Sequence, residues 1–183
     1  MTHNILVSDP ISEKGLQSLI HHPDFNVDFK SGLTEKELVD IIPNYQGLIV
    51  RSQTQVTESI INHASNLKVI ARAGVGVDNI DIKSATLNGI LVVNAPDGNT
   101  ISATEHSVAM ILAMARNIPQ AYTSLKNKEW NRKAFKGVEL YQKVLGVIGA
   151  GRIGLGVAKR LKSFGMTVLA YDPFLTKEKA EQL

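Results

Sequence analysis

Apolar residues in the first hundred positions fall into five short runs, separated by stretches with helical spacing. The runs are rich in Ile, Val and Leu and have the length of strands, which are usually about five or six residues long. They lie at Ile5–Ser8, Asn26–Phe29, Leu48–Arg51, Lys68–Ala71 and Leu91–Asn94. The stretches with helical spacing are Ser12–His21, Thr34–Ile42, Glu58–Ala64 and Ile82–Asn88. Strands that alternate with helices predict an α/β fold with a parallel, doubly wound sheet.

The pattern changes at the turn-rich segment NAPDGN, residues 94–99. The strand–helix alternation stops there, and Pro, Gly, Asn and Asp residues mark loops for specific backbone reasons. We therefore expect a domain joint near residues 95–100, with one domain over residues 1–98 and another over residues 99–183.

A long helical pattern from about Ile101 to Asn127 opens the second domain. Ser102 and Glu105 have the spacing of a capping box at its start. The pattern is apolar over most of its circumference, and a helix of this kind must be covered on several sides.

The sequence after this helix has the pattern of a dinucleotide-binding βαβ unit. A predicted strand at Val144–Ile148 precedes the turn GAGRIG, residues 149–154, which opens a predicted helix at Arg152–Phe164. A second predicted strand, Met166–Tyr171, ends at Asp172, about 20 residues after the glycines, as the dinucleotide fingerprint requires. A glycine-rich turn in an unrelated βαβ unit is the alternative, and the complete context disfavours it.

Each residue of this turn has a physical role in such a site. Gly149 permits the tight turn, Gly151 lets the backbone approach a pyrophosphate, and Gly154 allows the helix to pack closely on the strand. The pyrophosphate would bind the free N–H groups at the start of the helix. Asp172 would accept hydrogen bonds from the ribose hydroxyls, and its charge would repel a 2′-phosphate, which favours NAD as the cofactor.

Two loops of the first domain could bind an anion. Arg51 follows one predicted strand, and Arg72 with the turn Gly74–Val75–Gly76 follows another. Ligands of open α/β sheets bind outside the carboxyl ends of the strands. Arginine offers a planar fork that fits phosphate, and successive N–H groups of a glycine turn can hold a carboxylate. Two surface arginines beside turns remain an alternative interpretation.

Composition narrows the class of protein. Of the 183 residues, 44% are hydrophobic and 20% charged, and the formal net charge of +3 is spread along the chain. This charge argues only weakly for an anionic partner such as nucleic acid. The absence of cysteine excludes disulfide and thiolate chemistry. The start of the chain turns polar too early for a signal peptide, and the apolar run Val108–Ala115 is far shorter than the roughly 20 residues of a membrane span. We expect a cytoplasmic protein without a membrane segment.

Other reactive or basic residues give weaker signals. The five histidines have no metal-ligand spacing, and Glu105 and His106, being neighbours in a predicted helix, point in different directions. The segment KNKEWNRKAFKG, residues 126–137, interleaves basic and aromatic residues as a nucleic-acid patch does. We favour a solvated connector whose Trp130 and Phe135 pack inward, and we predict neither a metal nor a nucleic-acid partner.

Several segments together resemble the D-isomer-specific 2-hydroxyacid dehydrogenases. They are VRSQTQVT, RAGVGVDNIDIKSATLNGILVVNAPDGNTISATEH, ARNIPQA, a W…F.G.EL pattern, LGVIGAGRIG and FGMTVLAYDP. The resemblance covers nearly the whole chain and is most specific from Arg51 onward. It implies a flavodoxin-like substrate domain, a Rossmann NAD-binding domain inserted into it, and a cleft between the two. The implied reaction is NAD-dependent oxidation of a 2-hydroxy acid.

The resemblance also implies roles for single residues. Gly149, Gly151, Arg152, Ile153 and Gly154 would form the pyrophosphate turn, and Asp172 the ribose contact. The Gly74–Gly76 loop would hold the substrate carboxylate, with Val75 also near the nicotinamide. Arg51 and Arg72 would bind the phosphate end of a phosphorylated acid. Arg72 is the more specific of the two, because relatives that act on unphosphorylated acids usually lack an arginine before this glycine turn. The implied reaction is oxidation of 3-phospho-D-glycerate to 3-phosphohydroxypyruvate, the first step of phosphorylated serine biosynthesis.

The chain departs from the family pattern in one respect. The family's catalytic arginine, glutamate and general-base histidine have no counterparts here, and the Rossmann domain stops after its first βαβ unit. We therefore expect an N-terminal portion of a longer enzyme, inactive by itself, whose substrate domain lacks its C-terminal completion. The resemblance implies a homodimer or higher homo-oligomer joined through the 101–127 helix and the following connector. The alternatives are another D-2-hydroxyacid dehydrogenase and an NAD-sensing binding protein of the same family.

Overall fold

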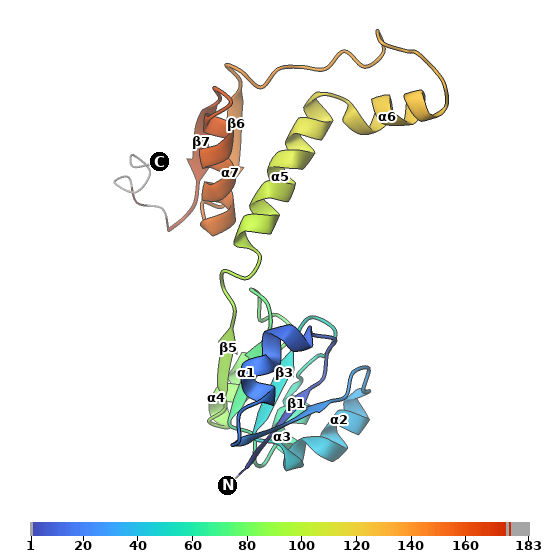
Figure 1. Cartoon of the computed structure of the whole chain (residues 1–183). Helices are drawn as coiled ribbons and strands as arrows, with labels where there is room; N and C mark the ends of the chain where they lie inside the picture. Colours follow the sequence, from blue (N-terminus) through green and yellow to red (C-terminus); the bar gives the residue numbers. More distant parts are fainter. Residues whose placement is uncertain (1, 175, 177–183) are drawn as a thin grey trace. The chain divides into compact units, whose positions relative to one another are not determined.

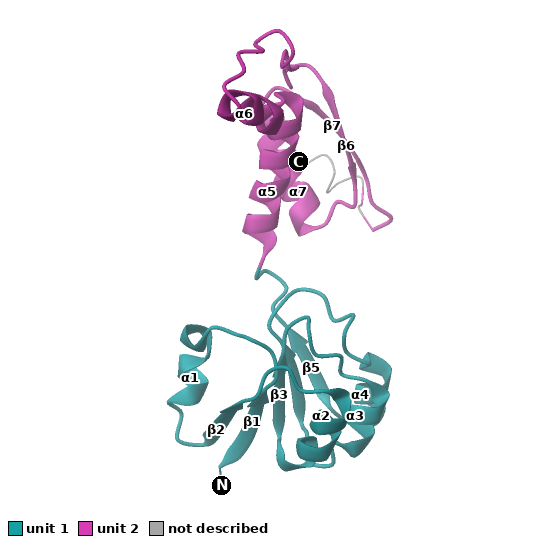
Figure 2. Cartoon of the chain, turned by 90° about the vertical axis from the view of Figure 1, so that its right-hand side faces the viewer, with its two compact units in different colours: residues 1–98 teal, residues 99–183 magenta. Residues whose placement is uncertain are grey.

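A computed structural model describes residues 2–174 and residue 176 of the chain. The chain divides into two compact units, Met1–Gly98 and Asn99–Leu183, shown in different colours in Figure 2. Each unit has its own parallel sheet.

The first unit contains a five-stranded parallel sheet. The strands are β1 (His3–Val7), β2 (Phe25–Phe29), β3 (Gly47–Val50), β4 (Val69–Arg72) and β5 (Leu91–Asn94). Their order is β2-β1-β3-β4-β5, and every neighbouring pair is parallel. This is the flavodoxin-like doubly wound order, so the predicted fold class is confirmed.

Helices cover both faces of this sheet. Figure 2 shows α1 on one side and α2, α3 and α4 on the other. The elements are η1 (Glu13–Leu16), α1 (Gln17–Ile20), α2 (Glu35–Ile41), η2 (Ile42–Asn44), α3 (Glu58–His63) and α4 (Ile82–Leu87). The helix predicted over Ser12–His21 begins with the 3-10 turn η1, and only its last part is an α-helix. The Thr34 hydroxyl accepts from the Glu37 N–H, and the Glu37 carboxylate accepts from the Thr34 N–H, which caps α2.

Two buried clusters lie on opposite faces of the sheet, because successive strand residues point to opposite sides. The larger cluster includes Leu6, Leu48 and Ile70 beneath α2, α3 and α4. The smaller includes Val7 and Ile49 beneath η1 and α1. The central strands β1, β3 and β4 therefore contribute side chains to both faces, which fixes their register.

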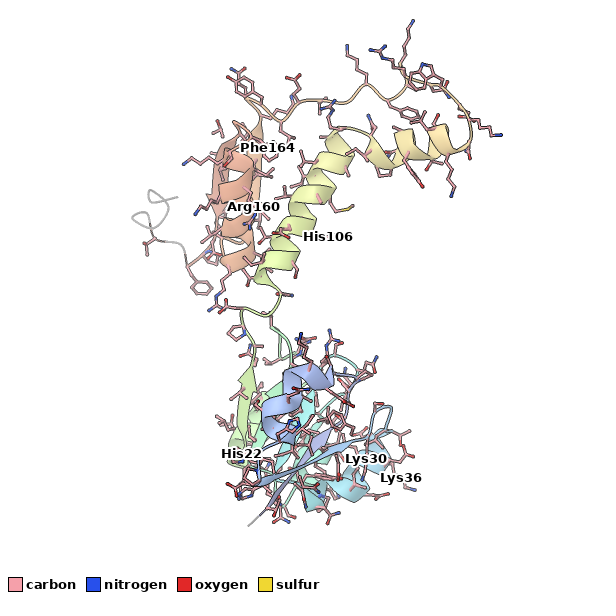
Figure 3. The ribbon with its side chains drawn as sticks, in the orientation of Figure 1. His22, Lys30, Lys36, His106, Arg160 and Phe164 are labelled. Carbon is pink, nitrogen blue, oxygen red and sulfur yellow. The ribbon has the colours of Figure 1, made fainter. Side chains whose placement is uncertain are left out.

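A polar contact lies at the β2 edge of the sheet. The buried Tyr45 phenol donates to Asp28 Oδ2 at 2.8 Å and accepts from Lys30 Nζ at 3.0 Å (Figure 3 labels Lys30). Burial raises the pKa of the Tyr45 phenol above its ordinary value, and the hydrogen bond to Tyr45 raises the pKa of Lys30. The Tyr45 hydroxyl is thus a structural contact at this edge.

The second unit contains helices α5 (Thr100–Ala115) and α6 (Ile118–Lys126), followed by a parallel βαβ unit. That unit consists of β6 (Val144–Ile148), α7 (Arg152–Lys162) and β7 (Thr167–Tyr171). Helix α5 packs against α7 (Figure 1), and a methyl group added at Gly156 would lie 2.7 Å from Thr104 Oγ1. The close approach of these two helices therefore depends on a glycine.

The structure corrects two features of the predicted 101–127 helix. It is broken between α5 and α6, where Asn117 takes the left-handed conformation with φ 53° and Pro119 follows two residues later. A left-handed residue ends a helix, and Pro119 has no N–H with which to continue the hydrogen bonding of α5 to the Ala115 carbonyl. The predicted capping box is also wrong, because α5 begins at Thr100 and places Ser102 inside its first turn. The Ser102 hydroxyl there donates to the Asn99 carbonyl at 3.1 Å.

Candidate functional site

The two predicted arginines lie on neighbouring strands of the first sheet. Arg72 is the last residue of β4 and pairs with Val50, the last residue of β3. Arg51 is the next residue after Val50 and therefore lies close to Arg72. Arg72 Nε donates to the Arg51 carbonyl at 3.1 Å. The structure therefore brings both arginines to the carboxyl edge, where ligands of such sheets bind.

The glycine turn after β4 lies against the Arg72 guanidinium. A methyl group at Gly74 would lie 2.2 Å from Arg72 Nη1, so only glycine leaves room for the guanidinium in this position. The end of β5 holds the turn, since the Ala95 N–H donates to the Gly74 carbonyl at 2.9 Å and Asn94 Nδ2 donates to the Val75 carbonyl at 2.6 Å. Asn94 is a site residue that we did not predict.

The same turn presents backbone donors. Among the described residues, the N–H groups of Val75 and Gly76 donate to no acceptor. Asp78 is a nearby negative charge, since a methyl group at Gly76 would lie 2.8 Å from Asp78 Oδ1. Adjacent free N–H groups form an anion-binding concavity, and with the two arginines they suit a ligand with two anionic ends.

A buried carboxylate, which we also did not predict, holds the loop that carries Arg51. Asp9 follows β1 and is only 2% exposed. Its Oδ2 accepts from the Arg51 N–H at 2.6 Å and the Gln53 N–H at 3.1 Å. Its Oδ1 accepts from the Thr54 N–H at 3.0 Å and the Thr54 hydroxyl at 2.5 Å. Arg51 and Arg72 were predicted because they lie at the ends of strands. Asp9 also lies at the end of a strand, and this was the one feature of the sequence that could have indicated it.

Asn79 holds the same loop by donating hydrogen bonds to two carbonyl groups of that loop. Its side chain is buried, and Nδ2 donates to the Arg51 carbonyl at 2.9 Å and the Thr54 carbonyl at 2.7 Å. Its Oδ1 is buried without a hydrogen-bond partner among the described residues. The geometry of both donor contacts fixes the orientation of the amide. No sequence pattern singled out Asn79.

The glycine turn of the second unit has the geometry of a dinucleotide fingerprint. Gly149 has φ 94°, which only glycine adopts readily, and its N–H donates to the Tyr171 carbonyl at 2.8 Å. A methyl group at Gly154 would lie 2.1 Å from the Gly149 carbonyl oxygen, so the helix packs directly on the turn. A methyl group at Gly151, the N-cap of α7, would meet nothing within 4 Å. Gly149 and Gly154 are therefore needed for the backbone conformation and packing of the turn. At Gly151 the space next to the backbone is open.

The start of α7 and the end of β7 complete this turn. Arg152 and Ile153 form the first turn of α7, where backbone N–H groups lack acceptors within the helix. Asp172 Oδ2 accepts from the Ala150 N–H at 2.8 Å, and Oδ1 accepts from the Phe174 N–H at 2.8 Å. Each carboxylate oxygen retains a further lone pair for a ligand hydroxyl. Asp172 thus has a structural contact in addition to its predicted role.

The histidines considered in the sequence do not form a cluster at the Arg72 turn or at the Gly149 turn. His22 precedes β2 in the first unit, and His106 lies on α5 of the second (Figure 3). The described residues contain no group of three or more His, Cys, Asp and Glu side chains that could hold a metal ion, and no helix among them is long and apolar enough to cross a membrane. A cavity of about 640 Å³ beside the connector is lined by Arg116, Arg132, Lys133 and Lys136, among others, but by no predicted site residue.

The connector differs from its prediction. Trp130 is 79% exposed and does not pack inward, whereas Phe135 is half-buried. Trp130 lies in the irregular segment after α6, and among the described residues no element covers its indole ring. An exposed tryptophan is common at protein interfaces, where large aromatic side chains supply contact area.

Comparison with known sequences identifies relatives over almost the whole chain. Residues 5–183 match the family model of the D-isomer specific 2-hydroxyacid dehydrogenase, catalytic domain. The chain is 54% identical over 179 residues to a D-3-phosphoglycerate dehydrogenase of Archaeoglobus fulgidus, covering 98% of this chain and 34% of that protein. The Homo sapiens D-3-phosphoglycerate dehydrogenase is 45% identical over 174 residues, covering 95% of this chain and 32% of that protein. The chain thus spans about a third of the length of the curated relatives it matches.

Solved structures show the same fold. A protein of Thermus thermophilus, TT0316, matches with a TM-score of 0.85 and 30% identity, over 95% of this chain and 57% of that one. An NAD+-bound 3-phosphoglycerate dehydrogenase of Entamoeba histolytica matches with a TM-score of 0.78 and 30% identity, over 98% and 57%. A D-lactate dehydrogenase of Aquifex aeolicus complexed with NAD and lactic acid matches with a TM-score of 0.83 and 28% identity, over 98% and 54%. This chain therefore belongs to the D-isomer-specific 2-hydroxyacid dehydrogenase family.

Proposed function

We propose that the chain acts as part of an NAD-dependent D-3-phosphoglycerate dehydrogenase of the cytoplasm. The proposed reaction oxidises 3-phospho-D-glycerate to 3-phosphohydroxypyruvate and begins the phosphorylated route to serine. The main support is the juxtaposition of Arg51, Arg72 and the Gly74–Gly76 turn at one strand edge, in a chain 54% identical to a D-3-phosphoglycerate dehydrogenase. A protein of the relatives' length that contains this chain is called the complete enzyme below.

The first unit would supply the substrate contacts. Arg51 and Arg72 would bind the phosphate, because a guanidinium forms two parallel hydrogen bonds with phosphate oxygens. The free N–H groups of Val75 and Gly76 would bind the carboxylate, with Val75 also near the nicotinamide. Holding both anionic ends orients the hydroxyl-bearing carbon between them, and orientation of this kind lowers the barrier to reaction.

The second unit would begin the cofactor site. Gly149, Gly151, Arg152, Ile153 and Gly154 fit a pyrophosphate on the α7 N-terminus, and Asp172 fits the adenosine ribose. When bound, NAD would accept the hydride of the substrate. We propose no general base in this chain. Asp78, whose Oδ1 lies near Gly76, is a poor candidate because its negative charge would repel the substrate anion.

The reaction and the cofactor are tested together in the complete enzyme. We expect NADH formation from 3-phospho-D-glycerate with NAD, and much slower reduction of NADP, because the Asp172 carboxylate repels a 2′-phosphate. Replacing Asp172 by alanine should raise the KM for NAD and reduce the preference for NAD over NADP. Equal use of both cofactors by the unaltered enzyme would refute the role of Asp172. Oxidation of D-glycerate or D-lactate in preference to the phosphorylated acid would favour another dehydrogenase, and NAD binding without turnover would favour a sensor protein.

A homodimer is the proposed assembly, formed through α5, α6 and the connector. Large apolar side chains on these segments are exposed: Met110, Met114, Ile118, Tyr122, Leu125 and Trp130. Exposed apolar side chains that gather on neighbouring segments are typical of an interaction surface. An isologous pairing of two such surfaces fits the chemistry, and obligate interfaces of this type bury more than about 2,000 Å².

Sedimentation of the 183-residue chain at micromolar concentration should therefore give a dimer. Met114 is 73% exposed in the single chain, so Met114→Glu should cost little in a monomer but should place a charge inside the proposed interface. We expect the variant to sediment as a monomer or to become insoluble. A stable monomer formed by the unaltered chain, or a dimer unaffected by Met114→Glu, would contradict the interface.

A further inference from the structure

One buried carboxylate, that of Asp9, binds the loop that carries Arg51. Asp9 is 98% buried at the end of β1, and it accepts from three backbone N–H groups and one hydroxyl of residues 51–54. A buried carboxylate is costly unless it is fully hydrogen-bonded. The loop N–H groups supply these bonds, so loop and carboxylate stabilise each other across more than forty residues of sequence.

The backbone carbonyl of Arg51 is held by hydrogen bonds as well. Asn79 Nδ2 and Arg72 Nε both donate to the Arg51 carbonyl, at 2.9 and 3.1 Å. Asp9 holds the N–H of the same residue at 2.6 Å. The backbone of Arg51 is thus fixed at both of its polar groups by side chains from three separate segments. The Arg51 side chain itself is exposed.

We propose that Asp9 and Asn79 are positioning residues that set the preference of the site for a phosphorylated acid. They fix the point from which the Arg51 guanidinium reaches the phosphate, and they fix the carbonyl that orients Arg72. A misplacement of about 1 Å can cost roughly a hundredfold in a site that depends on orientation. This inference rests on the proposed function, because it assumes that Arg51 and Arg72 bind phosphate.

The test is Asp9→Asn in the complete enzyme, with 3-phospho-D-glycerate and D-glycerate compared as substrates. The amide keeps the size of the side chain but replaces one acceptor oxygen by a donor that faces the loop N–H groups. We expect the KM for 3-phospho-D-glycerate to rise by about tenfold or more, as for the loss of a hydrogen bond to a charged group. The kcat should change much less, and so should kcat/KM for D-glycerate.

Tyr45→Phe is the matched control. It removes a buried hydroxyl that bonds Asp28 and Lys30 in the same sheet and does not touch the Arg51 loop. A general loss of stability in the first unit should appear in both variants, whereas a changed ratio of kcat/KM between the two substrates should appear only in Asp9→Asn. An unchanged ratio in a folded Asp9→Asn enzyme would overturn the proposal, and so would an equal change in Tyr45→Phe.

Thr54→Val provides a second variant should Asp9→Asn fail to fold. It removes the hydroxyl that donates to Asp9 Oδ1, which also contacts the Ser8 hydroxyl at 3.0 Å, and it keeps the shape of the side chain. We expect a smaller shift of the same ratio in the same direction, and the absence of any shift would overturn the proposal. If the unaltered enzyme does not oxidise 3-phospho-D-glycerate, the proposed function itself fails, which separates that outcome from a failure of Asp9 alone.

Discussion

Replacing Arg72 by alanine should raise the KM of the complete enzyme for 3-phospho-D-glycerate by about tenfold to a hundredfold. A hydrogen bond to a charged group contributes about 1.5–3 kcal/mol, and about 1.4 kcal/mol corresponds to a factor of ten. Arg72→Ala should exceed Arg51→Ala in effect, because Arg72 also donates to the Arg51 carbonyl and lies on the Gly74 turn. Its loss should therefore remove a proposed phosphate contact and also loosen the Arg51 loop and the Gly74 turn.

The comparison needs a charge control and a substrate control. Lys68 is exposed and immediately precedes β4, at the opposite end of the strand from Arg72. Lys68→Ala removes the same charge from the same unit and should leave the KM almost unchanged. D-glycerate, which lacks the phosphate, should be affected far less by Arg72→Ala than 3-phospho-D-glycerate is. Equal losses for both acids would show that Arg72 has a structural role.

Replacing Gly154 by alanine should both destabilise the second unit and abolish most of the affinity for NAD. The added methyl group would lie 2.1 Å from the Gly149 carbonyl oxygen, which is a backbone atom and cannot rotate away. Overpacking of this kind costs about 1–3 kcal/mol, and the displaced turn is the proposed pyrophosphate site. We expect a lower melting temperature of the chain and a KM for NAD raised by roughly tenfold or more in the complete enzyme.

Gly151→Ala separates the two effects. Its methyl group meets nothing within 4 Å of the protein, and its backbone is extended with φ −74°. The melting temperature should therefore stay unchanged, while the methyl group obstructs the approach of the pyrophosphate and raises the KM for NAD. Normal NAD binding by Gly154→Ala, or by Gly151→Ala, would contradict the placement of the cofactor at this turn.

Local patterns predict much of this fold. The five apolar runs match β1 to β5 within two residues at each end, because a parallel strand buried on both faces has a continuous apolar sequence. The Thr34–Glu37 capping box is confirmed, since both partners lie within one helical turn. The 101–127 helix shows the limit of such patterns. Its apolar residues continue through the break, which is set by the backbone of Asn117 and by Pro119.

Contacts between distant residues could not be predicted in this way. Asp9 meets Arg51, Gln53 and Thr54 across 42 to 45 positions, and Asn79 meets Arg51 across 28. No spacing rule relates these residues, and only the sheet order brings them together. Trp130 shows the converse error, because an aromatic residue was assigned to a core that the described residues do not form around it.

The most direct test of the proposed site is a crystal structure of the complete enzyme with 3-phospho-D-glycerate and NAD. We expect phosphate oxygens within hydrogen-bond distance of the Arg51 and Arg72 guanidinium groups, and the substrate carboxylate on the N–H groups of Val75 and Gly76. Asp172 should accept a hydrogen bond from the adenosine ribose. A phosphate bound away from both arginines, at any other part of the enzyme, would contradict the account.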